Sequence, residues 1–132
     1  MTITYAWRGD FDNADVNALH ADGFRHAVLD IDWLTQVRRH SLGWVCARAG
    51  DGTLVGFVNV AWDGGVHAFV LDTVVAESHR RSGIGAGLVA EAVRHSRGAG
   101  CEWLHVDFDD ELTSFYFDAC GFRPTPAGLI AL

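Results

Sequence analysis

The sequence predicts a single α/β domain over residues 1–132, in which a mixed, mostly antiparallel β-sheet is flanked by helices. Three observations favour this class. Residues 42–75 are rich in β-branched and aromatic side chains and are interrupted by turns that contain Asp-Gly. The segments before and after this region carry apolar residues at helical spacing. A strand-like run at 102–107 follows the second of these helical segments, so it must run parallel to the strand before that helix.

The first part of the chain predicts one strand followed by two helices. Residues 2–8 form the strand candidate at the amino terminus. Residues 10–24 and 30–40 have apolar residues at helical spacing and acidic residues near their starts. The acidic starts suit the positive end of a helix dipole, so both segments are assigned as helices.

The middle of the chain predicts three strands, which cover residues 43–48, 54–62 and 66–75. The turns between them, at 50–52 and 63–65, are short and rich in Asp and Gly. Short turns of this kind join antiparallel neighbours. We therefore expect an antiparallel meander at the centre of the sheet.

The carboxyl-terminal part predicts helix, strand, helix and strand. The first helix begins near Ile84, and the next strand occupies residues 102–107. A last helix ends at Gly121, and a last strand, interrupted by two prolines, covers residues 122–132. The complete order of elements is therefore β-α-α-β-β-β-α-β-α-β.

Composition excludes several classes of protein. The formal net charge of -7 comes from 17 acidic and 10 basic side chains, which argues against nucleic acid as a partner. The cysteines at positions 46, 101 and 120 are too far apart for a zinc site or a disulfide framework, so no metal is expected. The sequence lacks a signal peptide pattern and an apolar run of about 18 residues. We therefore expect a cytoplasmic protein without membrane association.

A candidate anion site lies in the segment Arg80-x-x-Gly83-x-Gly85, between a predicted strand and a predicted helix. Free backbone N–H groups and the positive end of the helix dipole converge there, and glycines let the backbone approach a phosphate. A P-loop is excluded because no lysine follows the glycines. A dinucleotide-binding loop fits poorly because Leu88 replaces its third glycine. A tight turn with ordinary packing is the alternative without a ligand.

Two longer segments carry a family resemblance. Residues 71–88 resemble the pyrophosphate-binding motif of the GNAT superfamily of N-acetyltransferases. Residues 114–122 resemble that superfamily's Phe-Tyr-x-x-x-Gly-Phe signature. The two motifs occur in the family's order with a strand between them, and the predicted order of elements is also similar. The resemblance therefore covers almost the whole chain.

The resemblance implies acetyl-CoA as co-substrate and a set of residues that bind it. The pyrophosphate would be held by backbone amides, with positive charge from Arg80; the amides are those of Arg81, Ser82, Gly83, Ile84, Gly85 and Ala86. The pantetheine arm would pair with the strand edge at Thr73, Val74 and Val75 and contact Phe115. Asp109 stands where the family often has an asparagine that bonds the pantetheine, although an ionised carboxylate cannot donate a hydrogen bond.

The resemblance also implies a general acid, and the sequence offers candidates for a general base. Tyr116 matches the tyrosine that protonates the leaving thiolate, but it also belongs to the apolar stripe of its helix. Asp72 is the candidate base, and an ion pair is its structural alternative. His67, His105, Asp107 or a chain of waters could serve instead.

Several residues are candidates for the acceptor pocket. Trp33, Trp62 and Glu77 could contact the acceptor, whereas Trp44 and Trp103, which lie within predicted strands, are expected in the core. The implied function is transfer of an acetyl group to a primary amine, on a small molecule or a protein, by direct attack in a ternary complex. A non-catalytic acyl-CoA-binding or sensory module is the alternative. A homodimer that uses the last strand is also expected from the family, while the acceptor and the range of acyl groups stay open.

Overall fold

A computed structural model describes residues 2–132 and has the predicted fold class. Its larger elements are β1 (Thr4–Trp7), α1 (Asn13–Phe24), α2 (Trp33–His40), β2 (Ser41–Arg48), β3 (Leu54–Trp62), β4 (His67–Val75), α3 (Ile84–Gly98) and β5 (Trp103–His105). Short 3₁₀ turns occupy Glu77–His79 and Asp110–Leu112. A single turn of wide, π-type helix at Ser114–Ala119, called the C-terminal helix below, replaces the predicted last α-helix.

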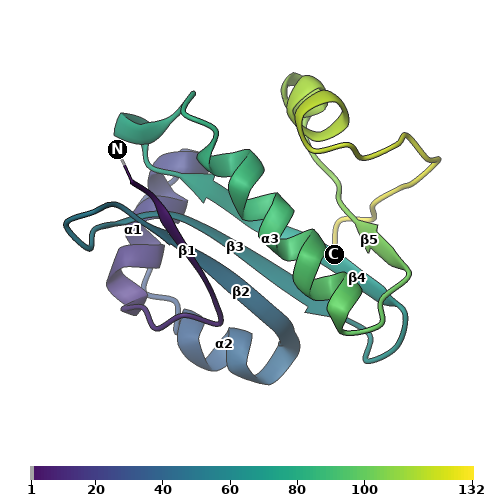
Figure 1. The fold of residues 1–132 in the computed structure, drawn as a ribbon, viewed down its shortest axis with the longest axis horizontal. Coiled ribbons are helices and arrows are strands. Elements are labelled where there is room, and N and C mark those ends of the chain that lie inside the picture. The colour runs from purple at the N-terminus through teal and green to yellow at the C-terminus, as the bar shows by residue number, and fades with distance from the viewer. Residues whose placement is uncertain (1) are drawn as a thin grey trace.

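The sheet has the strand order β1-β2-β3-β4-β5, so every strand lies beside its neighbour in sequence. The first four strands are antiparallel, and β5 pairs with β4 in parallel. Helix α3 connects β4 to β5 and crosses one face of the sheet, while α1 and α2 lie on the other face (Figure 1). The sheet is thus the middle of three layers.

Both faces of the sheet are packed at β2 and β3. Trp44 and Phe57 belong to the core cluster under α1 and α2, whereas Val45 and Val58 pack with Leu88 of α3. Adjacent residues of one strand point to opposite faces, so each central strand is buried on both sides. This explains why the two strands read as nearly continuous apolar runs.

The two amino-terminal helices begin later than the sequence predicts. Asp12 and Asp32 are the residues just before α1 and α2, so the acidic residues lie at or before the helix starts. The Asp32 carboxylate accepts hydrogen bonds from the backbone N–H and the hydroxyl of Thr35. These bonds satisfy an N–H group that has no partner within the helix, and they lower the pKa of Asp32.

Strand β4 contains a β-bulge that governs the site described below. Asn59 of β3 pairs with Leu71, and Phe57 pairs with Val74, so two residues of β4 lie opposite one residue of β3. Asp72, inside the bulge, has φ 58°, a left-handed conformation that aspartate tolerates better than most residues. The bulge therefore inserts one extra side chain into the alternation of β4.

Strands β4 and β5 pair over a short distance and then separate. Their register runs from His67 opposite Trp103 to Phe69 opposite His105, and no pairing continues beyond it in the described chain. The carboxyl-terminal half of β4 consequently has a free edge on that side. The C-terminal helix stands beyond this edge, at the upper right of Figure 1.

The last predicted strand, over 122–132, is not formed. Those residues are mostly exposed and have no strand pairing in the part of the chain that the structure describes. Pro124 and Pro126 lack the N–H groups that a ladder needs, which explains the irregular path. The placement of Trp103 in the core is also wrong: its side chain is 50% exposed, and the Arg123 guanidinium lies 5.2 Å from its ring centroid.

Candidate active site

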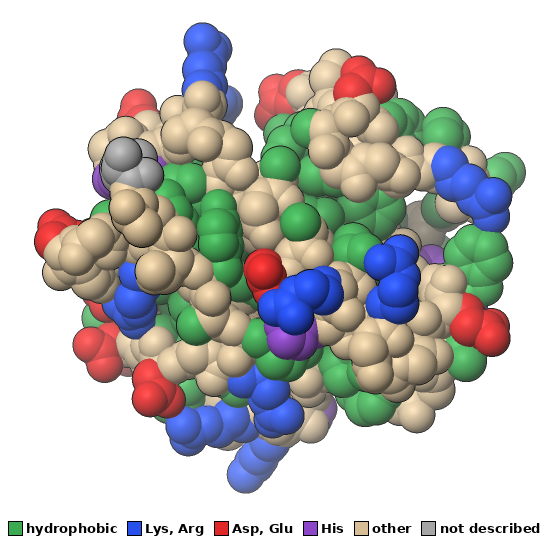
Figure 2. Space-filling view, in the orientation of Figure 1, with side chains coloured by type: hydrophobic (Ala, Val, Ile, Leu, Met, Phe, Trp, Pro, Cys, Tyr) green, Lys and Arg blue, Asp and Glu red, His purple; other side chains and the backbone are tan. Residues whose placement is uncertain are grey.

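A cavity of about 350 Å³ lies where β4 and β5 diverge. It is bounded by the last residues of β4, the start of α3 and the C-terminal helix. Figure 2 shows the surface hollowed between the α3 side and the carboxyl-terminal segment. The lining residues are Thr73, Val74, Val75, His79, Arg80, Arg81, Gly83, Ile84, Gly85, Ala86, Leu112, Phe115, Tyr116 and Ala119.

The floor of the cavity is the amino terminus of α3. Gly83 caps this helix with φ 84°, and the N–H of Gly87 donates the first hydrogen bond of the helix, to the Gly83 carbonyl. The preceding amides are therefore not used by the helix and can bind an anion. A Cβ on Gly85 would lie 3.0 Å from the Phe115 ring, so that glycine brings α3 and the C-terminal helix together.

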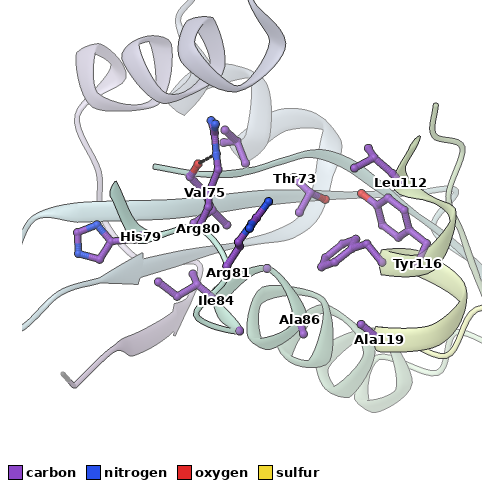
Figure 3. Close-up of a pocket in the computed structure, with 14 residues that line it drawn as sticks. Thr73, Val75, His79, Arg80, Arg81, Ile84, Ala86, Leu112, Tyr116 and Ala119 are labelled. Atoms are coloured by element: carbon purple, nitrogen blue, oxygen red, sulfur yellow. Dashed lines mark hydrogen bonds between the residues drawn. The ribbon is translucent and has the colours of Figure 1, made fainter. Parts of the chain in front are cut away.

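Two arginines stand beside this helix start in different states. Arg80 is tied down, because its guanidinium donates to the Val75 carbonyl at 3.2 Å and to the Asp22 carboxylate at 3.1 Å. Figure 3 draws the bond to Val75 as a dashed line. Arg81 is exposed, has φ 62°, and reaches along the cavity in the same view. Of these two arginines, Arg81 is therefore the one whose exposed charge is placed to meet a ligand in the cavity.

Tyr116 and Thr73 face each other across the cavity (Figure 3). The Tyr116 side chain is buried, and burial raises the pKa of its phenol, an effect that the facing Thr73 hydroxyl partly offsets. The Thr73 Oγ1 atom is itself buried and makes no hydrogen bond of normal geometry. A buried hydroxyl without a partner is uncommon and leaves a polar group that a ligand can satisfy.

Asp72 points away from this cavity, toward α1. Its Oδ1 lies 3.0 Å from Nε2 of His20, and the two side chains are 24% and 18% exposed. Nδ1 of His20 in turn lies 2.7 Å from Nε2 of His26, whose Nδ1 lies 2.7 Å from the Ala27 carbonyl oxygen. Two consecutive residues of the bulge therefore serve opposite sides of the sheet.

The structure brings most of the predicted cofactor residues, together with the predicted acid Tyr116, to one cavity. Those that line it are Thr73, Val74, Val75, Arg80, Arg81, Gly83, Ile84, Gly85, Ala86, Phe115 and Tyr116. Ser82 and Asp109 do not line the cavity. The Ser82 hydroxyl donates to the His79 carbonyl, and Asp109 is exposed just before the turn Asp110–Leu112.

The residues predicted for the acceptor pocket do not gather in one place. Trp33 is buried in the core, with its indole N–H donating to Asn17. Trp62 is half-buried at the end of β3, and Glu77 is exposed in the turn after β4. The base candidates His67, which is half-buried, and His105, which is exposed, contact each other at 2.8 Å outside the cavity lining.

Sequence reasoning missed three lining residues, His79, Leu112 and Ala119, and the two histidines beside Asp72. His79 adjoins the predicted anion loop, Leu112 shortly precedes the signature around Tyr116, and Ala119 lies within it, so proximity to a motif could have found them. No such signal existed for His20, because 52 positions separate it from Asp72.

Other kinds of site find no support in residues 2–132. No group of three His, Cys, Asp or Glu side chains there is arranged to hold a metal ion. All three cysteines are free, and burial raises the pKa of the Cys46 thiol to about 11. No helix of the described chain is long and apolar enough to cross a membrane.

Comparisons with known sequences and solved structures identify proteins that are similar to this chain. A sequence model described as the acetyltransferase (GNAT) family matches residues 5–122. A GNAT family acetyltransferase of Streptococcus pneumoniae TIGR4 is 25% identical, with TM-score 0.79, over 99% of this chain and 98% of that one. A comparison with curated protein sequences gave no match.

Two further solved structures share the fold at lower identity. Glucosamine-6-phosphate N-acetyltransferase from Arabidopsis thaliana has TM-score 0.76 and 17% identity, over 98% of both chains. AAC(6')-Iy, solved with the bisubstrate analogue CoA-S-monomethyl-acetylneamine, has TM-score 0.78 and 18% identity, over 100% of this chain and 98% of that one. At these identities the likeness concerns the fold.

Proposed function

Because this chain belongs to the acetyltransferase (GNAT) family, we propose that it transfers the acetyl group of acetyl-CoA to a primary amine by direct attack in a ternary complex. The observation that carries the proposal is the cavity, which joins the start of α3 to the Tyr116 phenol along the free edge of β4. Such a cavity suits an elongated ligand with an anionic part at one end and a reactive part at the other.

The residues of the cavity fit acetyl-CoA in three respects. The unused amides before Gly87 and the Arg81 guanidinium suit a pyrophosphate. In the part of the chain described, the edge of β4 at Thr73 to Val75 has no strand partner on the β5 side, and only the bond from Arg80 to the Val75 carbonyl uses it. It suits the amide groups of a pantetheine arm, which can pair with a strand. The orphan Thr73 hydroxyl faces the region where the thioester would lie, next to Tyr116.

In the proposed reaction the acceptor nitrogen attacks the thioester carbonyl, and the carbon–sulfur bond then breaks. Tyr116 gives its proton to the departing thiolate. Burial raises the pKa of the phenol, so Tyr116 carries this proton at neutral pH. Asp72, on the opposite side of the bulge, is the proposed acceptor of the proton that the amine must lose.

The first experiment tests donor binding with a matched pair of glycine variants. Gly83 and Gly64 both have positive φ, 84° and 79°, and a Cβ on either meets no atom within 4 Å. Gly83→Asp places a carboxylate at the proposed pyrophosphate site, and Gly64→Asp places the same charge in the β3–β4 turn. Neighbouring like charges cost about 1 to 4 kcal/mol, so we expect about tenfold or greater loss of acetyl-CoA affinity for Gly83→Asp alone.

The measurement is the melting temperature during titration with acetyl-CoA, because a ligand at 100 times its Kd stabilises a protein by about 2.7 kcal/mol. An unchanged melting temperature of the original protein at saturating acetyl-CoA would refute the proposed donor. Release of free thiol with a panel of amines then tests transfer itself. Binding without release for any amine would favour the non-catalytic acyl-CoA-binding module.

A further inference from the structure

The hydrogen-bonded row Asp72, His20, His26 has a property that follows from counting its protons. Three contacts join the row end to end: Asp72 to His20 at 3.0 Å, His20 to His26 at 2.7 Å, and His26 to the Ala27 carbonyl at 2.7 Å. Each contact needs one hydrogen. Two neutral imidazoles supply only two N–H groups, because each neutral ring carries one proton.

An ionised Asp72 and two neutral histidines therefore leave the row one proton short. All three contacts form only when the row takes up one further proton. That proton can reside on Asp72, on His20 or on His26, and all three contacts are made in each case. Moving it between the two ends breaks no hydrogen bond. A histidine is also the side chain whose charge ordinarily changes near neutral pH.

We propose that Asp72, His20 and His26 form a proton relay that takes the ammonium proton of the acceptor at Asp72 and releases it at the loop between α1 and α2. The inference rests on the proposed acetyl transfer. Asp72 is the group that would meet an acceptor that approaches the thioester from the α1 side of β4, and its side chain is 24% exposed. His20 and His26 act through Asp72 and are positioning residues.

The proton balance of the relay is simple. The acceptor arrives as R–NH₃⁺ and leaves one proton on Asp72, which frees the nitrogen lone pair for attack on the thioester. The proton moves through His20 to His26, and it reaches solvent when the His26 Nδ1–H bond to the Ala27 carbonyl opens. A second proton leaves the nitrogen when the amide forms, and it balances the proton that Tyr116 gives to the thiolate.

Packing holds the middle of the relay in place. The His20 ring lies 4.4 Å from Phe24 and 5.2 Å from Trp33, measured between ring centroids. These neighbours, from α1 and α2, are uncharged, so the groups that face His20 and can change charge are Asp72 and His26. The charged residue that follows on α1, Asp22, is paired with Arg80.

The molecule contains its own reference for the relay. His67 Nδ1 lies 2.8 Å from His105 Nε2, a comparable contact between two rings, but no carboxylate among residues 2–132 bonds to either ring. Nitrogen-15 NMR of the histidine rings from pH 8 to pH 5 follows both pairs in one sample. We expect His20 and His26 to share the uptake of one proton in a single step that moves nitrogens of both rings together.

Two variants make the test decisive. Asp72→Asn removes the charge that favours this proton, so we expect the shared step to move to lower pH by about 1 unit. Asp30→Asn, which removes an exposed carboxylate from the α1–α2 loop, should leave the step in place. The His67–His105 pair should not respond to either variant. Separate titration of His20 and His26, or the same curve for Asp72→Asn as for the original protein, would overturn the relay.

The rate test uses His26→Gln, which keeps a hydrogen-bonding side chain that cannot carry the proton. We expect kcat to fall about tenfold at pH 7 and the loss to shrink at higher pH, while acetyl-CoA binding is unchanged. A uniform loss at every pH would contradict the relay and point to a structural role. Failure of acetyl-CoA binding in the original protein would instead refute the proposed function, because the NMR titration needs no substrate.

Discussion

Two consecutive residues of β4, Asp72 and Thr73, face opposite sides of the sheet in unlike surroundings. Thr73 faces the cavity, with its own hydroxyl unbonded and the amides at the start of α3 unused by the helix. Asp72 faces α1, where its carboxylate is bonded to His20 and, through it, to His26. The difference separates the side proposed to bind the acetyl donor from the side proposed to move a proton. The predictions below test this division.

The largest effect is expected at Tyr116, on the cavity side. Tyr116→Phe removes the proposed acid and keeps the ring that packs on Phe108 at 4.7 Å. We expect kcat to fall about 100-fold or more, since a buried site offers no substitute donor, and acetyl-CoA affinity to change less than about twofold. Steady-state rates with a responsive amine, together with a binding titration, check both parts. Full turnover in the variant would remove Tyr116 from the mechanism.

A smaller loss of rate is expected at Asp72. Asp72→Asn keeps the left-handed backbone, which asparagine also tolerates, and removes the charge. Because this side chain is 24% exposed, water can take part of the role, and we expect about a 10- to 100-fold loss of kcat at pH 7. Rates measured from pH 6 to pH 9 should recover as the free amine becomes abundant. A constant deficit across this range would contradict the base assignment.

Thr73→Val tests whether the orphan hydroxyl is kept for a ligand. Valine has nearly the same shape, so removal of a buried group without a partner should stabilise the free protein by about 1 kcal/mol. Denaturant unfolding with and without acetyl-CoA measures the effect. If the hydroxyl serves the ligand, the gain shrinks when acetyl-CoA is present. A loss of stability in the free protein would mean that Thr73 has a partner of its own.

Removal of the charge on Arg80 or on Asp22 should change acetyl-CoA affinity by a smaller amount, and in opposite directions for the two variants. Both side chains are more than 40% exposed, so neither Arg80→Gln nor Asp22→Asn should change the free energy of unfolding by more than about 0.5 kcal/mol. We expect Arg80→Gln to weaken acetyl-CoA binding about two- to threefold. Asp22→Asn frees the guanidinium and should strengthen acetyl-CoA binding by a similar factor. Equal losses in the two variants would show a purely structural pair.

The smallest effect concerns stability at alkaline pH. The folded state raises the pKa of Tyr116, so the folded protein binds a proton more tightly there than the unfolded chain. The corresponding stability is present below the ordinary tyrosine pKa of about 10 and is lost as pH rises above it. The decline of unfolding free energy from pH 9 to pH 11 should therefore be shallower in Tyr116→Phe. An identical slope would contradict the raised pKa.

The cavity side could be predicted from the sequence because its signals are local. Gly83 before a helix pattern, with arginines beside it, marks the start of α3, and that helix begins at Ile84 as predicted. Phe115 and Tyr116 belong to a compact signature near Gly121. Each of these features occupies a few consecutive positions, so the sequence alone brings them together.

The Asp72 side could be predicted only in part, because its geometry depends on distant residues. An aspartate in a β-branched run gives no sign of a left-handed bulge, which results from the register with β3. His20 and His26 are ordinary histidines until α1 packs against β4. The prediction of a last strand over 122–132 was wrong. Its apolar residues suggested pairing, but Pro124 and Pro126 lack the N–H donors that pairing needs.

Asp72 is the extra residue of the bulge, so β4 could lose it and become a regular strand. Val70 and Val75 pack on the α3 side, and Val74 packs under α1 and α2. If Asp72 were deleted, Thr73 alone would stand opposite Val58, and Leu71, Thr73, Val74 and Val75 would alternate as an unbroken strand on their present faces. A single codon can therefore add or remove the carboxylate without repacking either layer. A relative of this protein could thus gain or lose the proposed base in one mutational event while it keeps the cavity on the other face.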